Sequence, residues 1–353
     1  MIAEQNTIVE RKSYPGLDIL KFLCSIVIIF LHINPFQGTV RFITKAIGNL
    51  GVPCFFIISG FLLFRKLYAT PKDEQNKIFF KQIKRLAILL GFWLIVYFLV
   101  CDFWWIRDGN ITENLLDYGR RILFGGSGFF LWYIVSLMFG ITITYFLWRK
   151  IKEYTLILSF VFFLIGAIPF AYQPLIIGSF FEKIYLWYID CFYTTRNGIF
   201  FAFPCLSAGM FIAKKERKIQ MLGKRVLYFL LPAICLFVGE CFLVYNLFQD
   251  MINPMQISVI VLSFALVIAF LQVNKKIRGL SWMRKISFLN YVIHPLWISL
   301  IPKLLSAVSS LNLDYYWYYF YGVQIPIVFL LTMGTGTLLI LLSHKIPFLK
   351  KIM

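Results

Sequence analysis

The sequence predicts an all-α membrane protein whose chain crosses the bilayer about ten times. Of its 353 residues, 60% are hydrophobic and only 14% are charged, against roughly 25% charged residues in soluble domains. Apolar runs close to the ~20 residues of a spanning helix recur along nearly the whole chain, whereas a barrel would show alternating stretches of ~10 residues. Lys and Arg gather in alternate connections between these runs, which is typical of a polytopic helical protein.

The apolar runs follow one another without an attached soluble region. The predicted spans are 17–36, 47–64, 86–104, 129–148, 154–171, 197–213, 226–246, 256–273, 286–307 and 317–343. We therefore expect a single integral membrane domain over residues 1–353, with an N-terminal segment 1–16, a helical bundle 17–343 and a tail 344–353.

The distribution of basic residues predicts the orientation of the chain. With the N-terminus in the cytoplasm, 26 of the 35 Lys and Arg residues lie on the inner side, as the positive-inside rule requires. Both termini are then cytoplasmic and the protein is a multi-pass protein of the plasma membrane. The net charge of +19 follows from these clusters, so the sequence favours a lipid bilayer over nucleic acid as a partner.

The cysteines do not indicate a metal site or a disulfide framework. The chain has seven, none forms a CxxC pair, and most lie inside apolar runs, where cysteine packs as a small hydrophobe. We therefore expect no metal.

The first span carries three ionisable residues inside the apolar stretch "GLDILKFLCSIVIIFLHINPF". At ~100° per residue, Asp18, Lys21, Ser25 and His32 fall on one helix face, and Asp18 and Lys21 can pair at i,i+3. Ionisable groups at membrane depth usually mark a substrate or ion path. The alternative is a structural stripe, with an ion pair near one interface and a histidine bonded to a neighbouring helix.

Three further polar positions each allow a functional and a structural interpretation. Ser59 precedes Gly60 in the second span and either contacts a substrate or belongs to a close helix contact. His294 precedes Pro295, and the sequence predicts that the helix is interrupted there. Arg196, at the outer end of the sixth span, either binds a ligand or extends to the interface.

Six motifs in this order resemble the acyltransferase-3 family of integral membrane acyltransferases. They are "LDILKFLCSIVIIFLH", "GVPCFFIISGFLL", "FFKQIKRLAILLGFWLIVY", "FLWYIVSL", "RNGIFFAFPCLSAGM" and "LNYVIHP". In the first motif, Lys21 and His32 fill the places of the family's basic residue and histidine. The chain is also similar to the membrane half of membrane-bound serine racemases.

The sequence departs from the family pattern at several places. Lys21 stands where Arg is frequent, and the two are not equivalent at a bidentate site. Gln82 occupies a position that is often basic. From the sequence we expect none of the soluble domains that some family members carry, including the racemase domain, within these 353 residues.

The resemblance implies an enzyme, a membrane O-acyltransferase. It would move an acyl group, typically acetyl, from cytoplasmic acetyl-CoA or another acyl-CoA to a hydroxyl of an exported glycan or other envelope acceptor. His32 would act as general base or transient acyl carrier, with Lys21 and Asp18 supporting it. Lys81, Lys84, Arg85 and Ser59 would bind acyl-CoA. Arg196, Trp132, Tyr133 and His294 are assigned to acceptor binding or to structure.

A transporter is the alternative class. The same bundle with a polar stripe suits movement of a small solute such as serine, although no internal repeat with matching broken helices is visible. The sequence leaves open the acyl group, the acceptor and the oligomeric state.

Overall fold

The computed structural model describes residues 13–33, 38–102, 110–124, 131–248, 252–275, 277–308 and 321–353. Across these ranges the regular structure is helical and contains no strand, which confirms the all-α class. The helices are α1 (Pro15–Ile33), α2 (Gly38–Asn49), α3 (Gly51–Tyr68), α4 (Gln75–Tyr97), η1 (Phe98–Asp102), α6 (Ile111–Phe124), α7 (Trp132–Ile151), α8 (Tyr154–Ala171), η2 (Gln173–Leu175), α9 (Phe180–Phe192), η3 (Gly198–Ala202), α10 (Phe203–Lys214), α11 (Glu216–Gln220), η4 (Gly223–Val226), α12 (Leu227–Phe248), α13 (Ile257–Phe270), α14 (Leu280–Val308), α16 (Tyr321–Leu342) and η5 (Pro347–Lys351).

The helical stretches agree with the spans expected from the sequence. Eight stretches of the described chain are long and apolar enough to cross a bilayer, and two shorter apolar helices cover Gly198–Lys214 and Ile257–Phe270. Each predicted span coincides with one of these ten stretches. The multi-pass membrane architecture is thereby confirmed, whereas ten crossings and cytoplasmic termini stay predictions.

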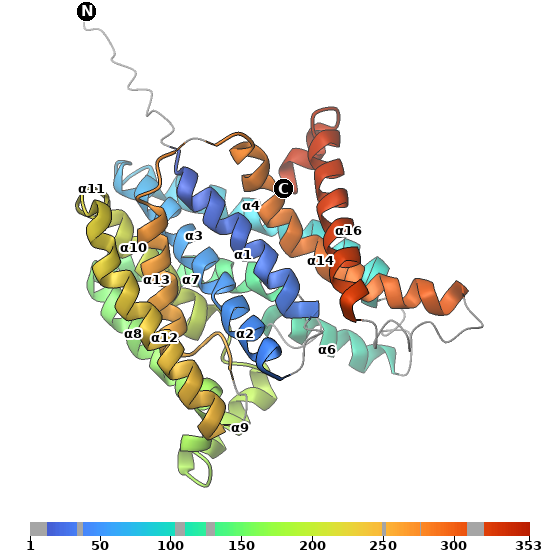
Figure 1. The fold of residues 1–353 in the computed structure, drawn as a ribbon, viewed down its shortest axis with the longest axis horizontal. Coiled ribbons are helices and arrows are strands. Elements are labelled where there is room, and N and C mark those ends of the chain that lie inside the picture. Colours follow the sequence, from blue (N-terminus) through green and yellow to red (C-terminus); the bar gives the residue numbers. More distant parts are fainter. Residues whose placement is uncertain are drawn as a thin grey trace, which may run out of the picture.

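The centre of the bundle is formed by α1, α3 and α10, with α14 and α16 on one side and α8, α12 and α13 on the other (Figure 1). Helices α3 and α10 approach closely because glycines face each other's backbone. A Cβ added to Gly60 would lie 2.4 Å from the carbonyl oxygen of Leu206, and one added to Gly209 would lie 2.1 Å from that of Ile57. Gly60 therefore has the packing role that the sequence analysis considered for the Ser59-Gly60 pair.

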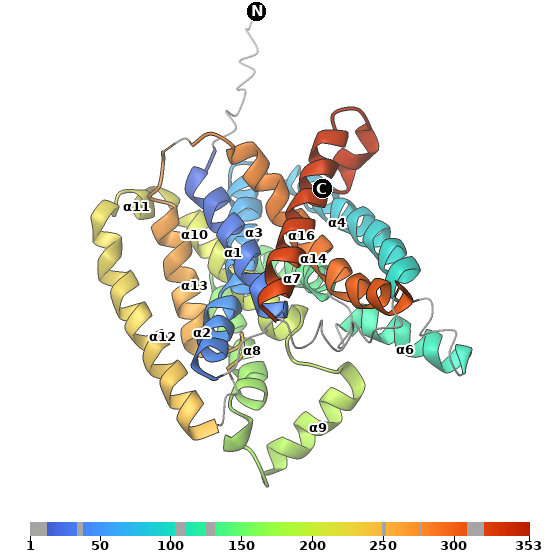
Figure 2. The same cartoon turned by 45° about the vertical axis from the view of Figure 1, so that its right-hand side comes forward.

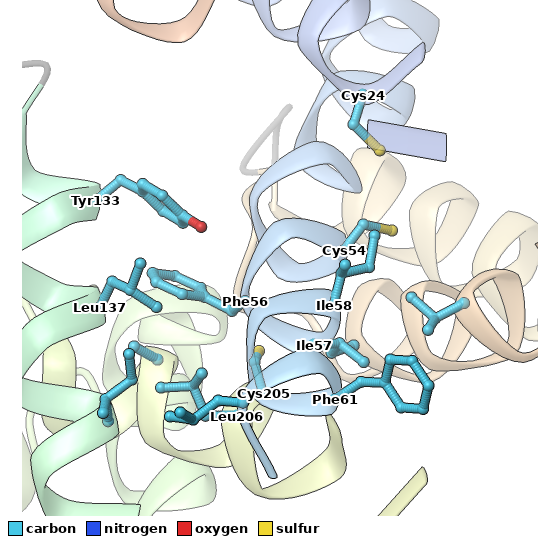
Figure 3. Packing of buried hydrophobic residues seen from close by; sticks show 14 of the residues in the cluster. Cys24, Cys54, Phe56, Ile57, Ile58, Phe61, Tyr133, Leu137, Cys205 and Leu206 are labelled. Carbon is cyan, nitrogen blue, oxygen red and sulfur yellow. The ribbon is translucent and has the colours of Figure 1, made fainter. Parts of the chain in front are cut away.

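The side chains of α3 fill the space between its neighbours (Figure 3). Phe56 points toward α7, where it packs against the ring of Tyr133 with centroids 4.6 Å apart. Cys54 lies on the opposite face of α3, toward Cys24 of α1. All three of Cys24, Cys54 and Phe56 are buried, so α3 is a central helix and fixes the positions of α1 and α7.

One end of the bundle, which we call the basic end, carries the start of α1 and the end of α16 (Figure 1). Ion pairs and hydrogen bonds connect its segments. Glu216 accepts from the hydroxyl of Tyr14 at 2.6 Å and from Nε of Arg65 at 3.1 Å, and Lys214 pairs with Glu153. The basic clusters that we predicted to lie on one side of the membrane therefore lie near one another, at one end of the bundle.

Two helix boundaries differ from the predictions at this end. The sequence analysis treated the basic stretch 65–85 as a connection, but α3 continues to Tyr68 and α4 already begins at Gln75. The side-chain amide of Gln75 explains the tight turn, because it donates to the carbonyl oxygens of Leu67 and Thr70 at 3.1 Å each. Lys, Arg and Gln are good helix formers, so the basic residues of this stretch suit the start of α4.

The predicted interruption at Pro295 is wrong, since α14 runs continuously from Leu280 to Val308 with Pro295 and Pro302 inside it. Packing against α1 and α16 holds the helix together where the proline removes one backbone hydrogen bond.

The opposite end of the bundle, which we call the far end, carries α2, α6 and α9 (Figure 2). Helices α6 and α9 lie within the connections 102–128 and 172–196. They are joined through Asp117 of α6, which accepts a hydrogen bond from Tyr193 and pairs with Arg121 at 2.5 Å. Nε of Arg120 also donates to the carbonyl oxygen of Cys191 at 2.9 Å. The "GGSG" segment of the first connection, Gly125 to Gly128, falls outside the described residues.

Candidate functional site

The polar stripe of α1 faces α14, and its first contact is an ion-pair cluster. Asp18 is 4% exposed and its carboxylate is shared by two cations. Nζ of Lys21 lies 3.0 Å from Oδ1, as expected for an i,i+3 pair, and Arg284 donates to Oδ2 through Nε at 3.0 Å and through a terminal nitrogen at 2.6 Å. Charge-assisted bonds of this kind are the strong ones in proteins, so Asp18 fixes the positions of both cations.

The second contact of the stripe lies two turns further along α1. The side-chain amide of Asn290 donates to the hydroxyl of Ser25 at 3.1 Å, and that hydroxyl donates to the carbonyl oxygen of Phe22 at 2.7 Å. Both side chains are 1% exposed or less. The buried Oδ1 of Asn290 has no hydrogen-bond partner among the described residues.

The third contact is a pair of histidines. The rings of His32 and His294 lie with centroids 5.0 Å apart, tilted by 53°. His294 is 1% exposed, whereas the side chain of His32 is exposed at the far end of α1. The structure thus brings together two histidines that lie more than 250 residues apart in the sequence.

The hydrogen bonds of these rings define their tautomers. Nδ1 of His32 lies 2.8 Å from the carbonyl oxygen of Ile28, and Nδ1 of His294 lies 2.6 Å from that of Asn290. A carbonyl oxygen only accepts hydrogen bonds, so we assign the proton of each neutral ring to Nδ1. Nε2 is then the basic nitrogen of each ring, which is the arrangement that a general base requires.

A cavity of about 590 Å³ runs beside the stripe and is lined by α1, α3, α4, α7, α14 and the residues after α16. All of its charged lining residues are basic; they are Lys21, Arg85, Arg284, Lys285 and Lys350. Of the four residues that the sequence assigned to donor binding, Arg85 and Ser59 line this cavity, and Lys81 and Lys84 do not. Such a basic cavity suits an anionic ligand.

The cavity ends against two tyrosines. Tyr133 and Tyr291 pack with ring centroids 5.2 Å apart, and the hydroxyl of Tyr133 lies 3.5 Å from that of Ser59. The sequence analysis assigned Tyr133 to acceptor binding or to structure; its side chain is buried and lines the cavity. Ile28 lines the same end and its carbonyl oxygen bonds to His32, so the histidine pair lies one helical turn beyond the cavity.

Arg196 and Trp132 form a separate group near the histidines. The guanidinium carbon of Arg196 lies 4.6 Å from the centroid of the Trp132 indole, within the range of a cation–π interaction. Its Nε is buried and has no hydrogen-bond partner among the described residues. Burial lowers the pKa of Arg196 to about 10, so the side chain remains protonated at neutral pH.

The sequence analysis missed the residues of α14 that complete this site. Arg284, Ser287, Asn290 and His294 recur at steps of three or four, with Tyr291 next to Asn290 and four residues after Ser287, which places them on one helix face. Only His294 was singled out, and Arg284 lies just before the predicted span 286–307. The spacing of the polar residues in "RKISFLNYVIH" was the signal that could have identified this second stripe.

No metal centre is formed by the described side chains, among which no group of three His, Cys, Asp or Glu could hold an ion. The site consists of a basic cavity, an ion-pair cluster whose cations Lys21 and Arg284 line it, and two histidines one helical turn beyond Ile28.

Comparison with known proteins agrees with these features. Residues 14–344 match the acyltransferase-3 family, an acyltransferase domain, and the chain belongs to this family. It is therefore a membrane acyltransferase of the multi-pass type. No solved structure matches the chain.

The curated relatives carry the names of racemases. An amino-acid racemase of Enterococcus faecalis is 25% identical over 238 residues, which are 65% of this chain and 32% of that protein. A serine/alanine racemase of Enterococcus gallinarum is 28% identical over 240 residues, which are 65% of this chain and 33% of that protein. The matched part is about a third of the length of these relatives.

Proposed function

We propose that the protein is an O-acyltransferase that takes an acyl group, typically acetyl, from acyl-CoA and transfers it to a hydroxyl of a glycan or other envelope acceptor. In this proposal the protein lies in the plasma membrane, with its basic end toward the cytoplasm, where acyl-CoA is made. The observation that carries the proposal is the position of the histidine pair, one helical turn beyond the end of the basic cavity.

The cavity supports acyl-CoA as the donor through its charge and its direction. Its basic residues lie toward the basic end, where the anionic nucleotide of CoA would bind to Arg85 and its neighbours. The apolar walls and Ser59 would surround the pantetheine arm. The thioester would then reach the end of the cavity, near Tyr133 and Tyr291.

The histidine pair supports the chemistry of acyl transfer. Nε2 of His32 would accept the proton of the acceptor hydroxyl, whose oxygen then forms a bond to the thioester carbon. The bond from carbon to sulfur breaks, and the proton passes to the thiolate of CoA. In the alternative course, His32 itself carries the acyl group between donor and acceptor.

The groups around the histidines support a separate acceptor site. His32 is the exposed member of the pair at the far end, so an acceptor could approach it from that side. Arg196 offers donors to acceptor hydroxyls or to the negative charge that develops on the carbonyl oxygen. Trp132 offers a flat apolar face of the kind that sugar rings pack against, although its ring also packs against Phe56 and Phe201.

The experiment is a thioester assay with the full chain in nanodiscs. The purified protein is incubated with acetyl-CoA labelled in the acetyl group, with and without an extract of envelope glycans, and labelled products and free CoA are measured. We expect slow hydrolysis alone and faster CoA release with acceptor. Acetyl-CoA that is neither hydrolysed nor used for transfer would contradict the proposal.

Transport of an amino acid is a second candidate, favoured by one observation. The matched relatives are named amino-acid racemase and serine/alanine racemase, so the shared membrane part could serve the movement of an amino acid. Uptake of labelled serine into proteoliposomes, independent of CoA, would support this candidate and exclude the first if acyl transfer is absent.

A further inference from the structure

The residues that follow α16 fold back onto the cavity. After Leu342 the chain turns and η5 runs beside α4, where the ring of Phe348 lies 5.8 Å from that of Phe92 (Figure 2). Lys350 and Met353 from this segment line the cavity. A stretch more than 250 residues after α4 thus contributes to the same wall as Arg85.

Two backbone contacts hold this segment on α4. The indole of Trp93 donates to the backbone oxygen of Ile352 at 3.3 Å, and Arg85 donates to that of Met353 at 3.4 Å. The side chain of Ile352 is 1% exposed and that of Trp93 is 3% exposed. The segment 347–353 is therefore attached by a buried apolar anchor.

The attachment determines which of two neighbouring lysines reaches the cavity. Lys350 lines it, whereas Lys351, the next residue and equally a surface lysine, does not. The charges of the cavity also differ in their partners. Lys21 and Arg284 share Asp18, whereas Arg85, Lys285 and Lys350 form no ion pair with any described side chain.

We infer that the segment 347–353 is part of the donor site and that Lys350 binds a phosphate of the nucleotide end of CoA. This inference rests on the proposed function, because it names a further residue of the same cavity. CoA carries a pyrophosphate and a ribose phosphate, and lining cations that form no ion pair with a described side chain suit these groups. Ile352 positions Lys350 by anchoring the segment, and does not itself touch the ligand.

The test measures binding of CoA to the full chain in nanodiscs by isothermal titration calorimetry, with pantetheine as a second probe that lacks all phosphates. Lys350→Gln should weaken CoA binding about fivefold, the loss expected for one solvent-accessible charge-assisted contact. Lys351→Gln is the matched control and should leave the Kd unchanged. Ile352→Ala should weaken CoA binding as Lys350→Gln does, because it releases the anchor.

Each result either supports or overturns the inference. Weaker binding of CoA but not of pantetheine by Lys350→Gln supports a phosphate contact. The inference is overturned if wild-type protein does not bind CoA, if both lysine variants bind equally, or if Lys350→Gln binds CoA more tightly. Loss of acetyl transfer with intact, Lys350-dependent CoA binding would contradict the proposed function alone.

Discussion

The two ends of the α1–α14 interface differ in whether their buried cations have a carboxylate partner. In the wall of the cavity, Lys21 and Arg284 share the carboxylate of Asp18, so the two positive charges are compensated before any ligand binds. Near the histidine pair, Arg196 has no carboxylate partner in the described chain and rests on the Trp132 ring. At the first end, which we call the compensated end, the folded protein already pairs the charges. At the second, which we call the uncompensated end, the guanidinium of Arg196 is available to interact with a substrate.

This difference has an energetic basis. A buried carboxylate that loses its partners typically costs about 3–5 kcal/mol, which makes the Asp18 cluster a structural requirement. A cation–π contact contributes only about 0.5–2 kcal/mol, which does not fully compensate the burial of a guanidinium. The pKa of Arg196 is accordingly lowered to about 10, and a hydroxylated or anionic substrate would improve its surroundings. We therefore expect substitutions near the histidines to affect activity, and those at Asp18 to affect folding as well.

The largest effect is expected for His32→Ala. Loss of a general base typically lowers the rate by about 10²–10⁴-fold, and an exposed residue at the end of α1 contributes little to folding. The measurement is acetyl transfer by purified protein in nanodiscs, with thermal stability as a check of folding. His344→Ala serves as the control because His344 is exposed and lies at the basic end. Full activity of His32→Ala would remove the histidine from the mechanism.

The second-largest effect is expected for Lys21→Ala, which changes the compensated end. Lys21→Ala should lower acyl transfer about 10- to 100-fold, because the cavity loses a cation that Asp18 positions. Lys21→Arg should retain most activity, since the charge and the pairing with Asp18 persist. Both variants should fold, because Arg284 still pairs with Asp18. Equal rates for the two variants would show that Lys21 has no part in the donor path.

A third prediction concerns Arg196, at the uncompensated end. Arg196→Gln should raise KM for the acceptor about tenfold, the loss of one charge-assisted contact, while hydrolysis of acetyl-CoA without acceptor stays unchanged. The control is Arg41→Gln, an exposed arginine of α2 at the same end of the bundle. An equal fall in acceptor-independent hydrolysis would assign Arg196 to the donor or to the reaction itself.

The helices and the first stripe could be predicted because both depend on local patterns. Apolar length identified the ten apolar helical stretches but not α6 and α9, and helical spacing identified the Asp18–Lys21 pair, which the structure shows at 3.0 Å. The partner helix could not be predicted in the same way. Arg284 meets Asp18 across 266 residues, and apolar helices in lipid carry no hydrophobic pattern that identifies their neighbours.

The direction of a side chain and the ends of a helix were harder to predict than the positions of the spans. The predicted span 129–148 places Tyr133 near its outer end, and only the structure shows that the ring turns toward α3 and Tyr291. The length of a span gives the depth of a residue and not the direction of its side chain. The early start of α4 was missed because apolar content marks the membrane, whereas the helix continues into its basic extension.

The smallest effect is expected for Asp117→Asn at the far end. The hydrogen bond from Tyr193, and then the pairing with Arg121, lower the pKa of Asp117 below its usual value. The carboxylate therefore stabilises the α6 contact above its unfolded pKa of about 4, and this contribution is lost as the pH falls through the lower, folded pKa.

At neutral pH the substitution should cost about 0.2–1 kcal/mol of local stability, the range of a surface ion pair. Hydrogen exchange of the α6 backbone amides measures this loss of local stability. The control is Glu113→Gln, because Glu113 is an exposed carboxylate of the same helix. The difference from wild type should persist between pH 7 and 5 and shrink below about pH 4. Since this contact holds α6 to Tyr193, three residues before Arg196, KM for the acceptor should change by about twofold at most. A change as large as that of Arg196→Gln would mean that α6, and not Trp132, holds the uncompensated end in place.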